Sequence, residues 1–90
     1  MSEIIHNSIL EELAEDPAEA VQLRLKSRLM NAIVNHIDKE GLTQDDASRL
    51  MNVQRTQVGN VCDGRVDKVT IDSLVAMAAR LGLDPLRSVA

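Results

Sequence analysis

QDDASRLMNVQRTQVGNVCD, residues 44–63, is the stretch of the chain that decides the fold. Its apolar residues form two groups, each spaced at i, i+3 and i+4: Ala47, Leu50 and Met51, then Val58, Val61 and Cys62. This spacing places the apolar side chains of each group on one face of a helix. Residues 52–54 interrupt the pattern, so the stretch predicts two short amphipathic helices joined by a turn of about three residues.

Two short helices joined in this way are the sequence form of a helix-turn-helix, whose second helix can enter the major groove of DNA. With the apolar residues turned inward, the second helix would expose a polar side: Gln54, Arg55, Thr56, Gln57, Gly59 and Asn60. Two alternatives remain open. The stretch could be a helical bundle that happens to bend here, or a helix-turn-helix that binds a protein instead of DNA.

Length and composition restrict the class of protein further. Ninety residues make one small domain, in which 44% of the residues are hydrophobic and none is aromatic. Aliphatic residues must fill the core, and base-stacking platforms for single-stranded nucleic acid are missing. No segment alternates well enough to predict a strand, so we expect an all-α protein. There is no membrane-spanning apolar run or export signal, which favours a cytoplasmic location.

The net charge of −4 is unevenly distributed along the chain. Residues 1–19 contain six acidic residues and no basic one, whereas residues 20–90 contain ten basic and eight acidic residues. The acidity therefore belongs to an N-terminal arm, and the rest of the chain carries only +2. Tight DNA binding usually relies on more positive charge. A DNA-binding function thus requires a dimer, locally clustered arginines or modest affinity.

Start and stop signals outline the helix before the motif. Asp16 followed by Pro17 predicts the start of a long helix that runs to about Glu40 and ends at Gly41. Its expected buried face consists of Val21, Leu25, Leu29, Ala32, Ile33 and Ile37. Thr43 opens the next helix, and Asp46 three residues later completes a short version of the capping box.

Similar signals follow the motif. Gly64 ends the second motif helix, residues 65–69 form a loop, and Thr70 caps a final helix that Gly82 ends. The expected buried face of the final helix consists of Ile71, Leu74, Val75, Ala78 and Leu81. The chain thus divides into an acidic arm (1–16), a helical domain (17–82) and a tail (83–90). We expect the tail to be irregular, although Leu86 and Val89 could cover an apolar surface or meet a second subunit.

Residues 41–81 resemble the Xre/Cro type of repressor helix-turn-helix. The residues that carry the resemblance match that motif in type and spacing: Gln44, Ala47, Ser48, Asn52, Val58, Gly59, Val61 and Gly64. Asn52 stands where glycine is more usual, and Asn tolerates a left-handed turn nearly as well. The resemblance implies a lambda-repressor-like all-α bundle of about five helices. Ala47 and Ser48 are expected where the two motif helices cross closely, although Ser48 could be simply structural.

Over residues 16–82 the chain is also similar to HigA-type antitoxins, which occur beside RelE/HigB-like toxins. This resemblance implies a homodimer that binds a double-stranded DNA operator, represses its own operon and neutralises a toxin. A stand-alone or phage repressor without a toxin is the first alternative, and a protein-interaction adaptor is the second. The arm and the tail are both candidates for the dimer surface.

The candidate DNA-binding residues follow from this arrangement: Gln44, Gln54, Arg55, Thr56, Gln57, Asn60, Arg65 and Lys68. Gln44 at a helix N-terminus suits a phosphate, as do Arg65 and Lys68 just past the second motif helix. Arginine can bind guanine, glutamine can bind adenine, and the threonine methyl can meet that of thymine. We therefore expect base contacts chiefly from Arg55, Thr56 and Gln57, with Asn60 as a further candidate.

Two positions depart from the HigA-type pattern. That subgroup often begins the recognition helix with Ser-Gln-Pro-Arg, whereas residues 54–57 here are Gln-Arg-Thr-Gln. A good helix cap is therefore lost, and the helix start is expected to fray or shift by a residue. Asp63 stands where Arg is often found, and its carboxylate would repel a phosphate if it faced DNA.

The acidic arm offers a possible surface for a partner. Ile9, Leu10 and Leu13 make an apolar stripe beside Glu11 and Glu12, which suits a small basic toxin of the kind named above. A solvated acidic face without a partner is the plain alternative.

The remaining reactive residues give no sign of catalysis. Cys62 is expected to be a buried structural thiol, and His6 and His36 stand apart from any companion ligand. No nucleophile–base pairing, phosphate-binding glycine loop or metal cluster is recognisable, so we expect no enzymatic activity and no cofactor.

Overall fold

The computed structural model describes residues 16–88, and within this range the chain is helical without strands. The helices are α2 (Pro17–Lys39), α3 (Gln44–Met51), α4 (Arg55–Cys62), α5 (Ile71–Arg80) and α6 (Pro85–Ser88), with a 3₁₀ turn, η1 (Val66–Lys68), after α4. The expected all-α bundle of about five helices is confirmed. Predictions made for residues 1–15 and for Val89 lie outside the described residues.

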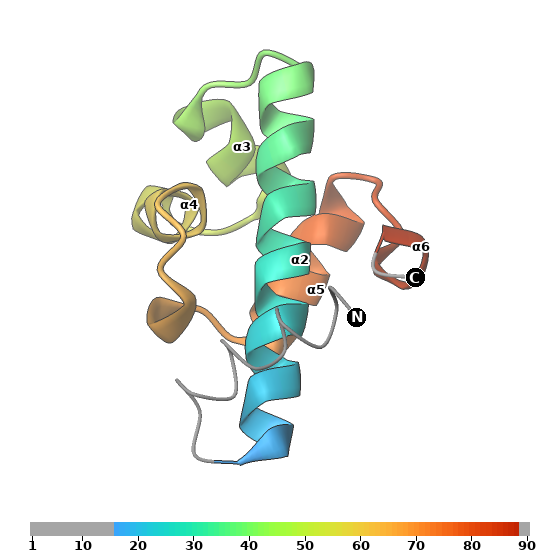
Figure 1. The fold of residues 1–90 in the computed structure, drawn as a ribbon. Coiled ribbons are helices and arrows are strands. Elements are labelled where there is room, and N and C mark those ends of the chain that lie inside the picture. Colours follow the sequence, from blue (N-terminus) through green and yellow to red (C-terminus); the bar gives the residue numbers. More distant parts are fainter. Residues whose placement is uncertain (1–15, 89–90) are drawn as a thin grey trace.

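Helix α2 is the long axis of the bundle, and α4, α5 and α6 pack against it, whereas α3 packs against α4 and α5 (Figure 1). The Asp16 side chain accepts a hydrogen bond of 3.0 Å from the Glu19 backbone N–H, and Pro17 occupies the first turn. At the other end Gly41 has a φ of 63°, a left-handed conformation that glycine adopts without steric cost. The predicted start and end of this helix are both confirmed.

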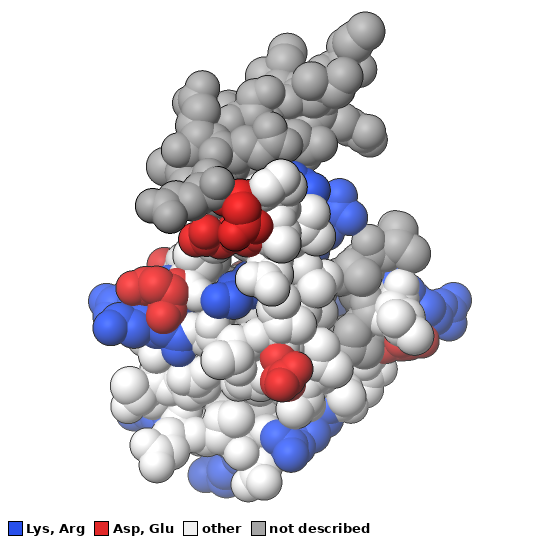
Figure 2. Space-filling model, turned by 90° about the horizontal axis from the view of Figure 1, so that it is seen from below, with Lys and Arg blue, Asp and Glu red and all other residues white. Residues whose placement is uncertain are grey.

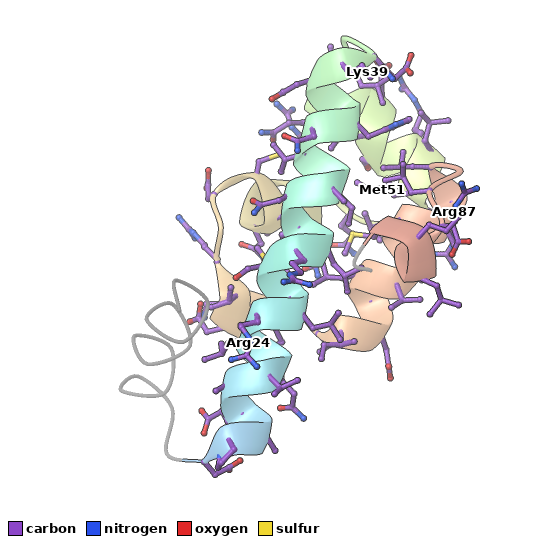
Figure 3. All side chains as sticks on the ribbon, turned by 45° about the vertical axis from the view of Figure 1, so that its right-hand side comes forward. Arg24, Lys39, Met51 and Arg87 are labelled. Carbon is purple, nitrogen blue, oxygen red and sulfur yellow. The ribbon has the colours of Figure 1, made fainter. Side chains whose placement is uncertain are left out.

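A single aliphatic core lies between α2 and the helices that pack on it. Figure 3 shows the side chains of this bundle on the ribbon. Its buried members are Leu29, Met30, Ile33, Ile37, Ala47, Met51, Val58, Val61, Val69, Leu74, Met77 and Ala78. The absence of aromatic side chains is thus met by aliphatic residues and methionine. Met30, Val69 and Met77 were not predicted to be in the core.

Three residues assigned to buried faces are exposed instead. Val21 and Leu50 each retain 52% of their accessible surface, and Val75 is also exposed. Residues at i+4 advance by about 40° around a helix, so Val21 lies roughly 120° from Ile33. Leu50 and Val75 lie at the edges of their apolar faces. Spacing therefore identified the faces, but it did not show how far neighbouring helices cover them.

The C-terminal tail is helical, which corrects the expected irregular structure. Asp84 accepts a hydrogen bond of 3.0 Å from the Leu86 backbone N–H, and α6 begins at Pro85. This Asp-Pro pair repeats the start signal of α2 at Asp16 and Pro17. Helix α6 packs against α2 and α5, whereas Leu86 remains 81% exposed.

The segment between α4 and α5 is more ordered than the expected loop. Backbone hydrogen bonding from Lys68 to the Arg65 carbonyl, at 3.0 Å, forms the η1 turn. The Lys26 ammonium donates to the Val66 carbonyl at 3.1 Å, which ties this turn to α2. No helix of the described residues is long and apolar enough to cross a membrane.

Candidate nucleic-acid interface

The first motif helix, α3, is held at its N-terminus by a reciprocal cap. Thr43 Oγ1 accepts from the Asp46 backbone N–H at 3.0 Å, and Asp46 Oδ2 accepts from the Thr43 backbone N–H at 3.2 Å. This confirms the predicted capping box. The hydrogen bond that the Thr43 backbone N–H donates to the Asp46 carboxylate lowers the pKa of that carboxyl, and the side chains of Thr43 and Arg49 lower it further. The N-terminus of α3 is therefore well defined.

The turn between α3 and α4 is left-handed at a single residue. Asn52 has φ 54° and ψ 48°, as expected for the residue that replaces the usual glycine. The Ser48 hydroxyl donates to the Val53 carbonyl at 2.7 Å, so Ser48 has a structural role. From α5, Arg80 donates to the Met51 carbonyl at 3.1 Å. The angle between the motif helices is thus set by local hydrogen bonds and by a side chain from elsewhere in the chain.

The second motif helix, α4, docks on the core through Val58 and Val61, both buried. Cys62 is half-buried beside them, and burial, followed by the carboxylates of Asp38 and Asp63, raises the pKa of its thiol. These positions confirm the predicted inward face of α4, except that Cys62 is not fully buried.

The N-terminus of α4 is open. Gln54 occupies the cap position without a side-chain hydrogen bond to the helix, and the helix begins at Arg55. The weak cap expected from the sequence is therefore present. Free backbone N–H groups and the helix dipole make such an end attractive to a phosphate or to the edges of bases.

The predicted DNA-binding residues fall into two groups at opposite ends of α4, which is about 12 Å long. Gln44, Gln54, Arg55 and Thr56 are all exposed at the N-terminal ends of α3 and α4. Arg65 and Lys68 are exposed beyond the C-terminal end of α4. Between them Asn60 is half-buried, and the Gln57 amide lies 3.4 Å from the Ser73 hydroxyl of α5. Gln57 is therefore half-buried, unlike Gln54, Arg55 and Thr56, and its predicted contact with a base stays a prediction.

Opposite charges are paired across this surface. Arg49 lies 2.9 Å from Asp46, Arg55 lies 3.4 Å from Asp45, and Arg65 lies 3.7 Å from Asp63. All six side chains are exposed, so each pair contributes little to stability and a DNA phosphate can displace it. The Arg65 guanidinium partly neutralises Asp63, whose charge was expected to repel phosphate.

The motif as a whole carries no net charge. Residues 44–68 contain four basic residues and four aspartates. On the face seen from below in Figure 2, which is the end of the molecule opposite α3, basic and acidic side chains are interspersed as well. One copy of the motif therefore offers little long-range attraction for DNA.

Three residues that take part in this arrangement were not singled out from the sequence for these roles. Asp45 contacts Arg55, Ser73 contacts Gln57, and Arg80 holds the Met51 carbonyl. The last two contacts join residues 16 and 29 positions apart in the chain. Local patterns of a single sequence carry no signal for pairings of this kind.

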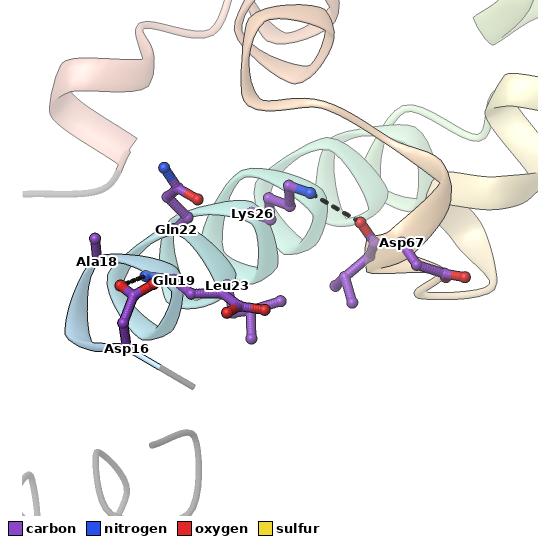
Figure 4. A pocket seen from close by; sticks show the side chains of 8 residues that line it. Asp16, Ala18, Glu19, Gln22, Leu23, Lys26 and Asp67 are labelled. Carbon is purple, nitrogen blue, oxygen red and sulfur yellow. Dashed lines mark hydrogen bonds between the residues drawn. The ribbon is translucent and has the colours of Figure 1, made fainter. Parts of the chain in front are cut away.

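Two hollows flank α2 away from the motif turn. The larger, of about 510 Å³, lies beside the N-terminal half of α2 and includes Asp16, Glu19, Lys26 and Asp67 (Figure 4). The smaller, of about 260 Å³, is lined by residues of α2 and by residues at and just after the C-terminal end of α4, among them Met30, Cys62 and Val66. Among residues 16–88, no group of histidine, cysteine or carboxylate side chains has the arrangement of a metal site.

Comparison with known proteins identifies the family. A family model described as a helix-turn-helix domain matches residues 9–85, which is most of the chain. The chain therefore belongs to this helix-turn-helix domain family, and its domain is that of a DNA-binding regulator. No significant match was found among curated proteins or among solved structures.

Proposed function

We propose that this helix-turn-helix protein is a sequence-specific repressor that binds a palindromic operator as a homodimer. We further propose that it is the antitoxin of a type II toxin–antitoxin pair, in which it represses its own operon and neutralises a RelE/HigB-like toxin. The main support for DNA binding is the arrangement of residues 44–56, which include the N-terminal ends of both motif helices and the turn between them. Arg55 and Thr56 are exposed at the N-terminus of α4 and Gln44 at that of α3, and the Arg55–Asp45 ion pair joins these two helix ends.

In this proposal α4 lies in the major groove with its N-terminus toward the bases. Arg55 binds the O6 and N7 atoms of a guanine, and the Thr56 methyl contacts a thymine methyl. Gln44 and the N-terminus of α3 hold a phosphate, which fixes the register of α4 on the duplex. Arg65 and Lys68, at the other end of α4, contact a second stretch of backbone.

The charge balance supports a homodimer over a monomer. A motif with four basic residues and four aspartates gains little from the release of counterions. Two copies on a palindrome double the base contacts, and the second copy binds at a high effective concentration. The resulting complex depends more on contacts to bases than on nonspecific attraction.

The antitoxin part is supported by the sequence resemblance of residues 16–82 and by the segregated acidity of residues 1–19. The apolar and acidic residues of the arm, Ile9 to Leu13, suit the basic surface of a small ribonuclease toxin. A stand-alone repressor would share the DNA surface but would need no partner for the arm.

The first experiment measures binding to a fragment of the protein's own promoter and to random DNA of equal length at several salt concentrations. We expect tighter binding to the promoter, and a steep loss of affinity as salt increases. Arg55→Ala should weaken the promoter complex by about 1–3 kcal/mol. Arg24→Ala, on the N-terminal half of α2 and away from the motif, is the matched control and should change little (Figure 3).

Equal binding to promoter and random DNA would refute the repressor function and favour a protein-interaction adaptor on the same scaffold. For the antitoxin part, the full chain and a variant lacking residues 1–15 are titrated with the small basic protein encoded next to it. Loss of affinity in the shortened variant supports the proposed role of the arm. Unchanged affinity would show that the arm does not bind the toxin.

A further inference from the structure

We infer that Asp45 determines specificity by positioning Arg55 for contact with a base. This inference rests on the proposed function, in which α4 lies in the major groove. Asp45 is in the first turn of α3, and Arg55 is the first residue of α4. Asp45 Oδ1 lies 3.4 Å from Arg55 Nη1, and the two side chains are 60% and 67% exposed.

This ion pair differs in position from the two others on the surface of the motif. Arg49–Asp46 lies within α3, and Arg65–Asp63 lies between residues two positions apart. The Arg55–Asp45 pair instead joins the N-terminal ends of the two motif helices. It therefore acts on the arginine that the proposed function assigns to base contact.

A carboxylate in the first turn of α3 is unexpected in the proposed complex, because DNA phosphates would approach this helix end and be repelled by it. Asp46 has such an explanation in the capping box with Thr43. Asp45 takes no part in that cap, and its carboxylate pairs with Arg55. An acidic residue in the first turn does favour the helix dipole, but any of several positions would serve that purpose.

The chemistry of arginine explains what the contact achieves. The guanidinium has five N–H donors, so an Asp45 contact at Nη1 leaves others free for the O6 and N7 atoms of guanine. An exposed arginine without a partner can swing to a phosphate of any sequence. The Asp45 carboxylate competes with the phosphate and restricts the arginine before DNA binds. Restriction of this kind lowers the entropy lost on binding the correct base.

Asp45 should consequently raise discrimination while lowering affinity for DNA in general. Repulsion between its carboxylate and the phosphate backbone weakens every complex. At the operator this repulsion is offset by the positioned Arg55, whereas on random DNA it is not. The ratio of operator affinity to random-DNA affinity therefore reports the positioning role.

The test compares wild type with Asp45→Asn, a change that removes the charge and nearly preserves the shape. Dissociation constants are measured by fluorescence anisotropy for a promoter fragment and for random DNA of the same length. We expect Asp45→Asn to bind random DNA about 3- to 10-fold more tightly and the promoter no more tightly than wild type. The discrimination ratio should thus fall by about 3- to 10-fold.

Two further variants separate positioning from charge. Asp72→Asn is the matched control because Asp72 is an exposed acidic residue in the first turn of α5. It should leave the ratio unchanged. In an Arg55→Ala background, Asp45→Asn should also leave the ratio unchanged, because no arginine remains to be positioned.

A scan of single base-pair substitutions through the promoter fragment locates the effect. Asp45→Asn should relax the preference at the same base pair as Arg55→Ala and at no other position. An Asp45→Asn variant that strengthens both complexes equally would overturn the inference and leave the repressor function standing. A wild-type protein that does not distinguish the promoter from random DNA would overturn both.

Discussion

Asn52 is the residue on which the geometry of the motif turn depends most directly. Its φ of 54° and ψ of 48° place it in the left-handed region, and its side chain is exposed. This conformation costs an L-residue about 1–2 kcal/mol of conformational free energy. The cost is smaller for asparagine than for most residues, because its short polar side chain can form hydrogen bonds to nearby backbone groups. Replacement by alanine removes that advantage without removing any buried surface.

We therefore expect Asn52→Ala to lower the free energy of unfolding by about 1 kcal/mol. For a domain of this size that loss corresponds to a decrease in Tm of about 4–8 °C. Asn52→Gly should lie within about 0.5 kcal/mol of wild type. Glycine relieves the steric cost of the left-handed turn, but it also increases the conformational entropy of the unfolded chain.

The assay is urea and thermal unfolding of the three proteins, followed by circular dichroism at the helical band. The slope of free energy against urea should be the same for all, so that differences in midpoint report stability. Gln54→Ala is the control, because Gln54 has an ordinary φ of −71° and makes no cap hydrogen bond. An alanine variant as stable as wild type, together with a glycine variant that is the least stable of the three, would contradict the steric cost assigned to the left-handed conformation at residue 52.

Four other predictions concern the motif and its surroundings. Gln54→Ser supplies the missing cap of α4 and should raise the free energy of unfolding in urea by about 0.5–1 kcal/mol. An unchanged free energy of unfolding would show that this helix end is not free to accept a cap. Met51→Ala, at a fully buried side chain, should lower it by about 2–5 kcal/mol, whereas Leu50→Ala next to it should cost much less because Leu50 is half exposed. Equal losses in these two variants would contradict the assigned faces of α3. Because burial raises the pKa of the Cys62 thiol, alkylation at pH 8 should be slower in the folded protein than in urea, and equal rates would argue against this. The lowered pKa of Asp46 stabilises the fold at pH values above the pKa of this carboxyl in the unfolded chain, and this stability is lost as pH falls through its pKa in the folded protein. The free energy of unfolding, measured from about pH 5 to about pH 2.5, should therefore depend less on pH in Asp46→Asn than in wild type. An unchanged dependence would contradict the capping role.

The helix boundaries could be predicted because they depend on neighbours in the chain. The cap at Asp16, the capping box at Thr43 and the left-handed residues Asn52 and Gly64 all involve contacts within a few residues. The same rule would have predicted α6, since Asp84 and Pro85 repeat the pair that starts α2. That signal was present in the tail, and the expectation of an irregular tail did not take it into account.

The candidate DNA surface could be predicted only in part. Exposure of Gln44, Gln54, Arg55 and Thr56 follows from the helical period once the apolar face is known. Gln57 shares that side of the helix in sequence terms, yet it lies against Ser73 because α5 passes close to it. Periodicity says which side of a helix is polar, but it does not say which other helix approaches that side.

The sequence by itself determined where the helices begin and end, that residues 44–63 form two helices and a turn, and that aliphatic residues fill the core. These features follow from φ preferences, caps and periodicity, which act over about four residues. Only the tertiary structure decided that Val21 is exposed, that Arg80 holds the motif turn, and that Asp45 lies beside Arg55. Burial and pairing of this kind depend on how one helix is placed against another, and rules that act within about four residues do not encode that placement.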